Sequence, residues 1–199
     1  MSVDSALIAL IRAVGLGQGA TANQLLDADL GLTSACVGRN EEFFLDGCLA
    51  QVYAGDTALH AAAFAYDVAF ARRLVDLGAG VRARNRRGCE PLHAATMGNP
   101  ASSHWDPVRQ RDVIVYLAEV GADPNAAAVG GVTPLHRAVR NRCSAAVDAL
   151  LRVGADPHVA NENGSTAFEL VHWTTGRGGT GSREARAEQK LIVDLLIYR

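Results

Sequence analysis

The sequence predicts an all-α solenoid, in which short helix pairs joined by hairpin-like loops stack along one domain. The first observation is a recurring motif whose glycines, Gly55, Gly88, Gly131 and Gly164, are 33, 43 and 33 residues apart. The second is a Gly-Ala pair that follows each of the first three copies near its end. The third is a set of apolar residues at helical spacing between the two motifs. Units this short cannot bury an apolar face alone, so neighbouring units must stack.

The composition is that of a folded protein. Of its 199 residues, 49% are hydrophobic and 20% charged, which suits a buried core. The 19 basic and 21 acidic residues leave a net charge of -2, which argues against bulk electrostatic binding of nucleic acid or of an anionic membrane. Every basic residue except Lys190 is an arginine, a bias typical of GC-rich, bacterial genomes.

The cysteines and the N-terminus favour a reducing compartment. Cys36, Cys48, Cys89 and Cys143 form no C-x-x-C pair, so neither a disulfide framework nor a structural zinc site is expected. The N-terminus has no signal-peptide pattern, and no run reaches the ~20 apolar residues of a membrane span. We therefore expect a cytoplasmic protein, although secretion as an effector is an alternative that the repeats leave open.

Each copy of the motif marks the start of a helix pair. Residues 55–60 read GDTALH, and the later copies read GCEPLH, GVTPLH and, more weakly, GSTAFE. Spacing and motif resemble the ankyrin repeat. This resemblance implies one domain over residues 1–199, with a diverged N-terminal cap and long loop (1–54), repeats at 55–87, 88–130 and 131–163, and a C-terminal cap (164–199). Residues 88–130 and 164–199 each carry an insertion.

Local chemistry explains why helices begin and end where the motifs stand. Thr57, Thr133 and Thr166 are placed to cap the first helical N–H groups, whereas Glu90 is expected to be a weaker cap. Proline fits the first helical position because its missing N–H costs nothing there. Glycine fits the end of each second helix because it readily adopts the left-handed conformation required at that position. The predicted helices cover residues 4–14, 21–28, 58–65, 67–77, 91–97, 108–120, 134–141, 144–153, 167–174 and 183–198.

Three insertions interrupt the regular repeat. They lie between residues 26 and 57, between 99 and 108, and from Gly176 to Ser182, where the sequence is glycine-rich. Insertions of this kind map to loops, often on the binding face. In the second insertion, Trp105 has two interpretations: it is a recognition tip, or it folds back and anchors its own loop.

Histidines at one position of three repeats invite a catalytic or metal-binding interpretation. His60, His93 and His136 cannot share an ion, because stacked helices lie roughly 8–10 Å apart and zinc ligands lie within about 2.1 Å of the metal. The resemblance implies that each bonds within its own repeat and to the next loop. Cys143, beside Arg142, is either a reactive thiol of lowered pKa or an ordinary thiol in a turn. With no nucleophile, zincin or Walker motif, we expect neither enzyme activity nor a cofactor.

Partner contacts in ankyrin proteins come from the inner face of each first helix and from the loop tips. The inner positions, four residues after each histidine or its equivalent, are Phe64, Met97, Arg140 and Trp173. Such residue types are enriched in interface cores, and an exposed row of them predicts a binding surface. The alternative is that the insertions cover Phe64 and Trp173, which then belong to the local core.

The loop tips complete the expected site. They include Tyr53, Asp56, Arg84, Arg86 and Arg87. Residues 82–87 form a basic finger, which together with Arg137, Arg140 and Arg142 suggests a positive patch on one side. We expect a monomer that binds another protein, with an acidic surface as the best match for the finger. The alternatives are a solvated tip, or nucleic-acid or other acidic-ligand binding through the finger, which the near-neutral net charge disfavours.

Overall fold

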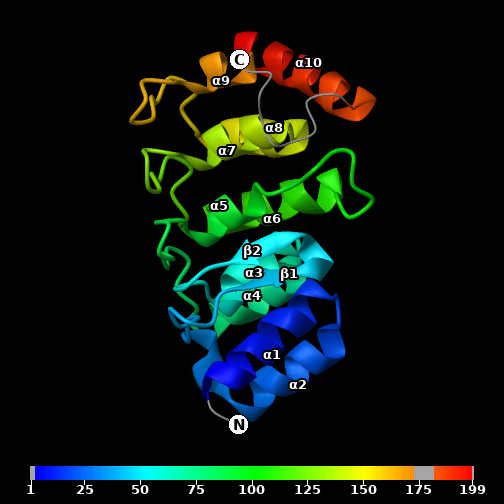
Figure 1. The fold of residues 1–199 in the computed structure, drawn as a ribbon, viewed down its shortest axis with the longest axis vertical. Helices are drawn as coiled ribbons and strands as arrows, with labels where there is room; N and C mark the ends of the chain where they lie inside the picture. Colours follow the sequence, from blue (N-terminus) through cyan, green and yellow to red (C-terminus); the bar gives the residue numbers. More distant parts are fainter. Residues whose placement is uncertain (1–2, 173–181, 199) are drawn as a thin grey trace.

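The computed structural model describes residues 3–172 and 182–198, which form an elongated stack of helix pairs (Figure 1). This confirms the all-α solenoid. The predicted helices are all present within these residues, with ends that differ by a few residues at most. They are α1 (Val3–Gly15), α2 (Gly19–Ala28), α3 (Ala58–Phe64), α4 (Val68–Asp76), α5 (Pro91–Ala95), α6 (Pro107–Glu119), α7 (Pro134–Asn141), α8 (Ser144–Arg152), α9 (Ala167–Val171) and α10 (Arg183–Ile197).

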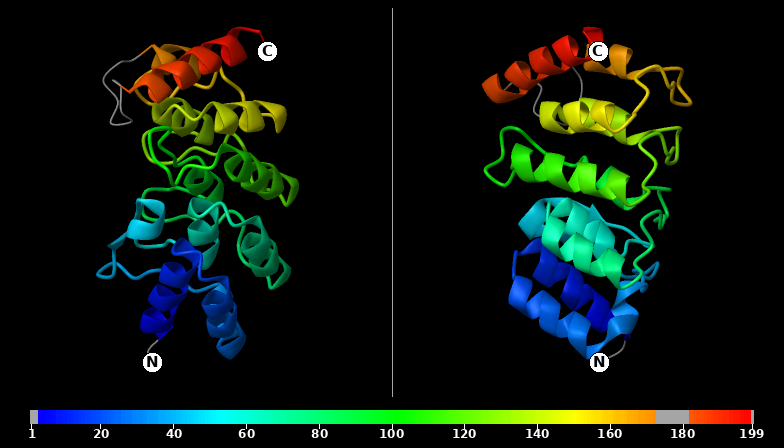
Figure 2. Two further views of the ribbon diagram at one scale, coloured as in Figure 1. Left: turned by 90° about the vertical axis from the view of Figure 1, so that its right-hand side faces the viewer. Right: turned by 180° about the vertical axis from the view of Figure 1, so that it is seen from behind.

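The helices form two layers, which are separated in the side view of Figure 2. The first helix of each pair contributes to an inner layer, in which α1 packs on α3, α3 on α5 and α7 on α9. The second helices form the outer layer, in which α4 contacts α6, and α8 contacts both α6 and α10. No helix among the described residues is long and apolar enough to cross a membrane.

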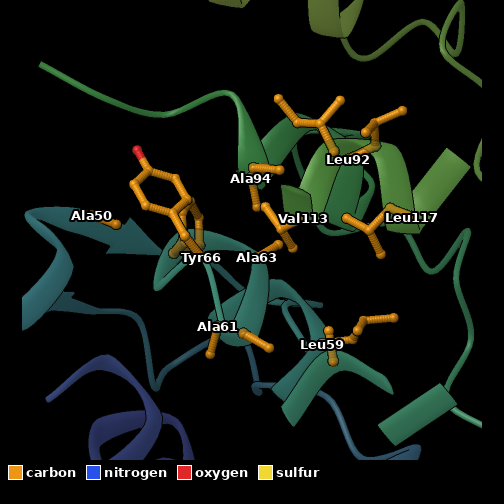
Figure 3. Close-up of a cluster of buried hydrophobic side chains, with 14 of the residues drawn as sticks. Ala50, Leu59, Ala61, Ala63, Tyr66, Leu92, Ala94, Val113 and Leu117 are labelled. Carbon is orange, nitrogen blue, oxygen red and sulfur yellow. The ribbon is translucent and has the colours of Figure 1, made fainter. Parts of the chain in front are cut away.

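The core is a continuous apolar strip between these layers. Figure 3 shows the side chains of Leu59 and Leu92 from consecutive inner helices, together with Val113 and Leu117 of outer helix α6. All four side chains are fully buried. Burial is therefore shared between neighbouring repeats, as expected of a solenoid whose units are stabilised by their interfaces.

Three buried histidines join each repeat to the next. The Nδ1 atom of His60 accepts a bond from the Thr57 N–H (3.1 Å), and its Nε2 donates to the Cys89 carbonyl (3.1 Å). His93 repeats this between Glu90 N–H (3.2 Å) and Val132 O (3.1 Å). His136 does so between Thr133 N–H (3.1 Å) and Ser165 O (3.0 Å). The predicted structural role of these histidines is confirmed.

The first insertion contains a β-hairpin that the sequence analysis did not predict. Strands β1 (Phe43–Leu45) and β2 (Ala50–Val52) are antiparallel, with Phe43 opposite Val52. Short 3-10 turns, η1 (Leu30–Thr33) and η2 (Asp46–Cys48), precede the hairpin and connect its strands. Leu45 is buried, and the Arg12 guanidinium of α1 lies 4.5 Å from the centre of the Phe43 ring. The hairpin thus packs on the N-terminal helices, on the side of the inner layer (Figure 2).

The contact between η2 and the end of α1 leaves no room for a side chain. A Cβ atom on Gly47 would lie 2.1 Å from the backbone oxygen of Gly15. We expect Gly47→Ala to lower the free energy of unfolding by about 2 kcal/mol, because the two backbones must move apart. The matched control is Gly19→Ala at the start of α2, where an added Cβ meets nothing within 4 Å. Chemical denaturation of the two variants measures the difference, and equal stabilities would contradict the expectation.

Candidate partner-binding groove

A groove of about 460 Å³ opens on the inner layer, beside α5 and α7. Its walls combine apolar and cationic side chains. Met97 follows α5, Arg137 and Arg140 lie on α7, and Tyr53, Arg87 and Val129 come from the loops. Val129 is 65% exposed, so the groove presents an aliphatic side chain to solvent beside its arginines.

The guanidinium of Arg137 is fixed at the floor of the groove. Its Nη1 donates to the Cys89 sulfur (3.0 Å) and its Nη2 to the Met97 sulfur (2.9 Å). Sulfur is a weak acceptor, so neither bond neutralises the cation. Within residues 3–172 and 182–198, neither Arg137 nor Arg87 nor Arg140 forms an ion pair with a carboxylate. The groove therefore presents three guanidinium groups that have no direct carboxylate partner among the described residues.

The predicted concave row is only partly exposed. Met97 and Arg140 border the groove, but the expectation that Phe64 is exposed is wrong, because its side chain is 9% exposed. Gln51 and Tyr53, at the end of the hairpin, surround with Phe64 a small cavity of about 60 Å³. The first insertion thus covers this end of the inner face. Trp173 and residues 176–181 of the third insertion lie outside the described residues.

Asp56 is a structural residue of its loop rather than an exposed tip, which corrects the sequence expectation. It is 1% exposed. Its carboxylate accepts from the Tyr53 N–H (2.7 Å) and from the Asn85 side-chain amide (2.8 Å). These bonds satisfy polar groups that would otherwise be buried without partners, so the side chain is not available to a protein partner.

The basic finger, residues 82–87, is largely neutralised by acids. Arg84 pairs with Glu90 (3.0 Å), Arg82 with Asp123 (3.5 Å), and Arg86 Nη2 donates to Glu42 (2.8 Å). The bond from Arg86, aided by one from the Ala54 N–H, lowers the pKa of Glu42 to about 2. The finger is therefore a weaker site for an acidic partner or for nucleic acid than its sequence indicates.

Arg87 differs from the rest of the finger. It has no ion pair with a carboxylate among the described residues, and it lines the groove together with Tyr53. Contact with the Tyr53 ring does not set it apart, because the guanidinium groups of Arg86 and Arg87 lie 5.0 and 6.0 Å from the centre of that ring. The structure thus divides the predicted tips into two groups. Tyr53 and Arg87 join the inner face, whereas Arg84 and Arg86 bind acids of their own chain.

Trp105 anchors its own loop. Its indole Nε1 donates to the Gln110 side chain (2.8 Å), and its ring packs against the core. A Cβ on Gly98 would lie 2.9 Å from this ring, so the loop is held closely. The half-exposed remainder of the indole lines a second cavity, of about 390 Å³, between the loops. The anchoring interpretation is thus supported, and a contact with a partner stays a prediction.

Cys143 and the three repeat histidines, which the sequence offered as candidates for catalysis or metal binding, are buried side chains. Burial raises the pKa of the Cys143 thiol to about 12, so a pKa lowered by the adjacent Arg142 was the wrong alternative. Burial also lowers the pKa values of His60, His93 and His136, which keeps these rings neutral. Within the described part of the chain, no three His, Cys, Asp or Glu side chains are grouped to hold a metal ion.

Sequence reasoning missed Val129 and placed Arg137 only in a general basic patch. Val129 lies in the loop before α7, where the motif GGVTPLH fixes Thr133 and His136 but does not indicate which earlier residues face the groove. Its available signal was an aliphatic residue between alanines and glycines in the loop before α7.

Comparison with known proteins agrees with this architecture. Residues 54–86 and 130–159 match the ankyrin-repeat family. Ankyrin repeat and SOCS box protein 16 of Mus musculus is 40% identical over 96 residues, which is 47% of this chain and 20% of that protein. Protein fem-1 homolog A of Homo sapiens is 34% identical over 91 residues, 44% of this chain and 14% of the human protein. The chain thus spans a fifth or less of the length of these relatives.

Proposed function

Because the chain is an ankyrin-repeat protein, and such repeats generally mediate protein–protein interaction, we propose that it is a non-catalytic module that binds another protein. The partner lies in the groove beside α5 and α7 and reaches the adjoining loops. The observation that carries the proposal is the groove itself, in which exposed Val129 and half-buried Met97 stand next to arginines without carboxylate partners among the described residues.

Two features of the inner face support this function over catalysis. The groove-lining residues combine apolar contact area with arginine, the combination typical of interface hot spots. The buried histidines and cysteines have pKa values shifted away from neutrality, toward uncharged and unreactive forms. A general base or a nucleophile instead requires a pKa near the working pH or a stabilised thiolate.

Site-specific photocrosslinking tests the proposal. A benzoylphenylalanine at position 129 should crosslink a second protein in the native lysate, because the partner covers this side chain. The matched control carries the same group at Leu77, which is 41% exposed after α4 and outside the groove. Products that form equally from both positions, or from neither, would refute binding in the groove. A nuclease-sensitive product would instead favour nucleic acid.

A further inference from the structure

We propose that the groove recognises an acidic peptide segment of the partner, whose carboxylates bind Arg137 and Arg140 while a neighbouring apolar side chain contacts Met97 and Val129. This inference rests on the proposed protein-binding function and adds the chemistry of the ligand. It transfers the acidic-partner prediction from the finger to the groove, because the finger arginines already bind Glu42, Glu90 and Asp123.

Arg137 is the centre of the proposed site. Its guanidinium is part-buried, and its Nη1 and Nη2 donate to the sulfur atoms of Cys89 and Met97. Replacing weak sulfur contacts by charge-assisted bonds to a carboxylate gives a large gain in interaction strength. Two acids of the adjoining loops, Asp56 and Glu90, are both 1% exposed. Asp56 accepts from the Asn85 amide and Glu90 Oε1 pairs with Arg84, whereas Glu90 Oε2 is buried without a hydrogen-bond partner among the described residues.

Arg140 and Arg87 extend the positive charge along the groove. Arg140 is exposed one turn after Arg137 on α7, and Arg87 borders the same groove beside Tyr53. Among the described residues that line this surface, three are arginines and none is acidic. A ligand with two or more carboxylates therefore matches its charge.

The apolar walls distinguish a peptide from nucleic acid. Val129, Val132 and Met97 line the groove together with the arginines, and aliphatic side chains of this kind receive Leu- or Ile-like residues of a peptide. Nucleic acid requires a basic stripe that follows a phosphate backbone. Here the stripe ends at Arg87, because Arg84 and Arg86 are paired with acids.

A random dodecapeptide library displayed on phage tests this inference, because it offers acidic, neutral and basic segments to the groove alike. Selection on the wild-type protein should enrich Asp and Glu at two or more positions, next to an aliphatic residue. Selection on the Arg137→Gln/Arg140→Gln variant should lose this enrichment. Absence of binders, binders without acidic residues, or the same acidic peptides from both proteins would each overturn the proposal.

Binding of one selected peptide, labelled with fluorescein, measures how much each arginine contributes to the affinity. We expect a dissociation constant about tenfold higher for Arg140→Gln, which removes one charge-assisted contact, and a similar loss when Glu in the peptide becomes Gln. The matched control is Arg152→Gln on outer helix α8, which changes the net charge equally but removes a pair with Asp148 away from the groove. Equal weakening by the control would show a nonspecific charge effect and would refute the groove site.

Three measurements separate failure of this inference from other causes. Arg140 is exposed, so the melting temperature of Arg140→Gln should equal that of the wild type. This holds even if Arg137→Gln is less stable because it lacks the contacts to the two sulfur atoms. Position 129 could crosslink to a protein while the Arg137 and Arg140 variants bind peptides as tightly as the wild type does. That result would retain the proposed protein-binding function and would reject the acidic ligand. Tighter binding of a labelled oligothymidylate than of the acidic peptide would reject both.

Discussion

Replacement of His93 by alanine should lower the free energy of unfolding by about 3 kcal/mol, because two buried backbone groups lose their partners and a cavity remains. The His93 side chain is fully buried. Its ring bonds the Glu90 N–H at the start of α5 and the Val132 carbonyl of the next repeat. The substitution therefore acts on the interface between two repeats, where a solenoid obtains its cooperativity.

Urea denaturation followed by circular dichroism measures this loss. The control is His104→Ala, since His104 is exposed in the second insertion and its hydrogen bonds within that loop go to Ser102. Its stability should match the wild type. Hydrogen exchange should also rise around Val132 and Thr133 in the His93 variant. A His93 variant as stable as the His104 variant would show that these buried bonds contribute little.

Sequence predicted the helix pairs well because the repeat encodes local and interface chemistry in the same few residues. Thr133, Pro134 and His136 cap α7, fix its first turn and bond the next repeat. Capping, the first helical turn and the bond to the next repeat each depend on a few adjacent residues. Because these residues recur in three copies, the pattern identifies the helix pairs reliably. Apolar periodicity then gives the outer helices, where Val113 and Leu117 face the core.

The insertions could not be predicted in the same way, because they occur once and depend on distant contacts. The segment Phe43–Val52 does contain an Asp-Gly pair, Asp46-Gly47, which is a hairpin signal that the sequence analysis did not use. The signal is weak here because the strands are three residues each and four residues, including η2, connect them. The position of the hairpin is fixed by packing of Leu45 and Gly47 on the end of α1. Burial of Phe64 follows from that placement, and no pattern around Phe64 itself indicates it.

The charge of the finger was misjudged for a related reason. Glu42 lies 44 residues from Arg86 in sequence and belongs to the first insertion. A basic run therefore appeared unopposed in the sequence, although folding brings an acid to it. Arginines on the regular helix α7 were easier to place, because a position in the repeat determines the face on which Arg140 lies.

Acidification should destabilise the fold in the range from pH 7 to pH 5, before most carboxylates titrate. Burial, and then the charge of Arg137, lowers the pKa of His93 to about 3, whereas an unfolded histidine binds a proton near pH 6.5. As the pH falls below about 6.5, the unfolded state gains a proton that folded His93 does not, so stability falls. The expected loss from His93 alone is about 2 kcal/mol between pH 7 and pH 5.

His60 and His136 should add to this loss, because burial lowers the pKa of each of them as well. The Asp56 carboxylate, 3.5 Å from His60 Nε2, opposes the shift at that ring, so His60 is expected to contribute less than burial alone would give. Urea denaturation at intervals of half a pH unit measures how steeply the free energy of unfolding falls with pH. In His93→Ala the loss between pH 7 and pH 5 should shrink by about 2 kcal/mol, since one titrating group is gone. An unchanged slope would mean that folded His93 takes up its proton near the normal pH, which is incompatible with an Nδ1 that accepts the Glu90 N–H.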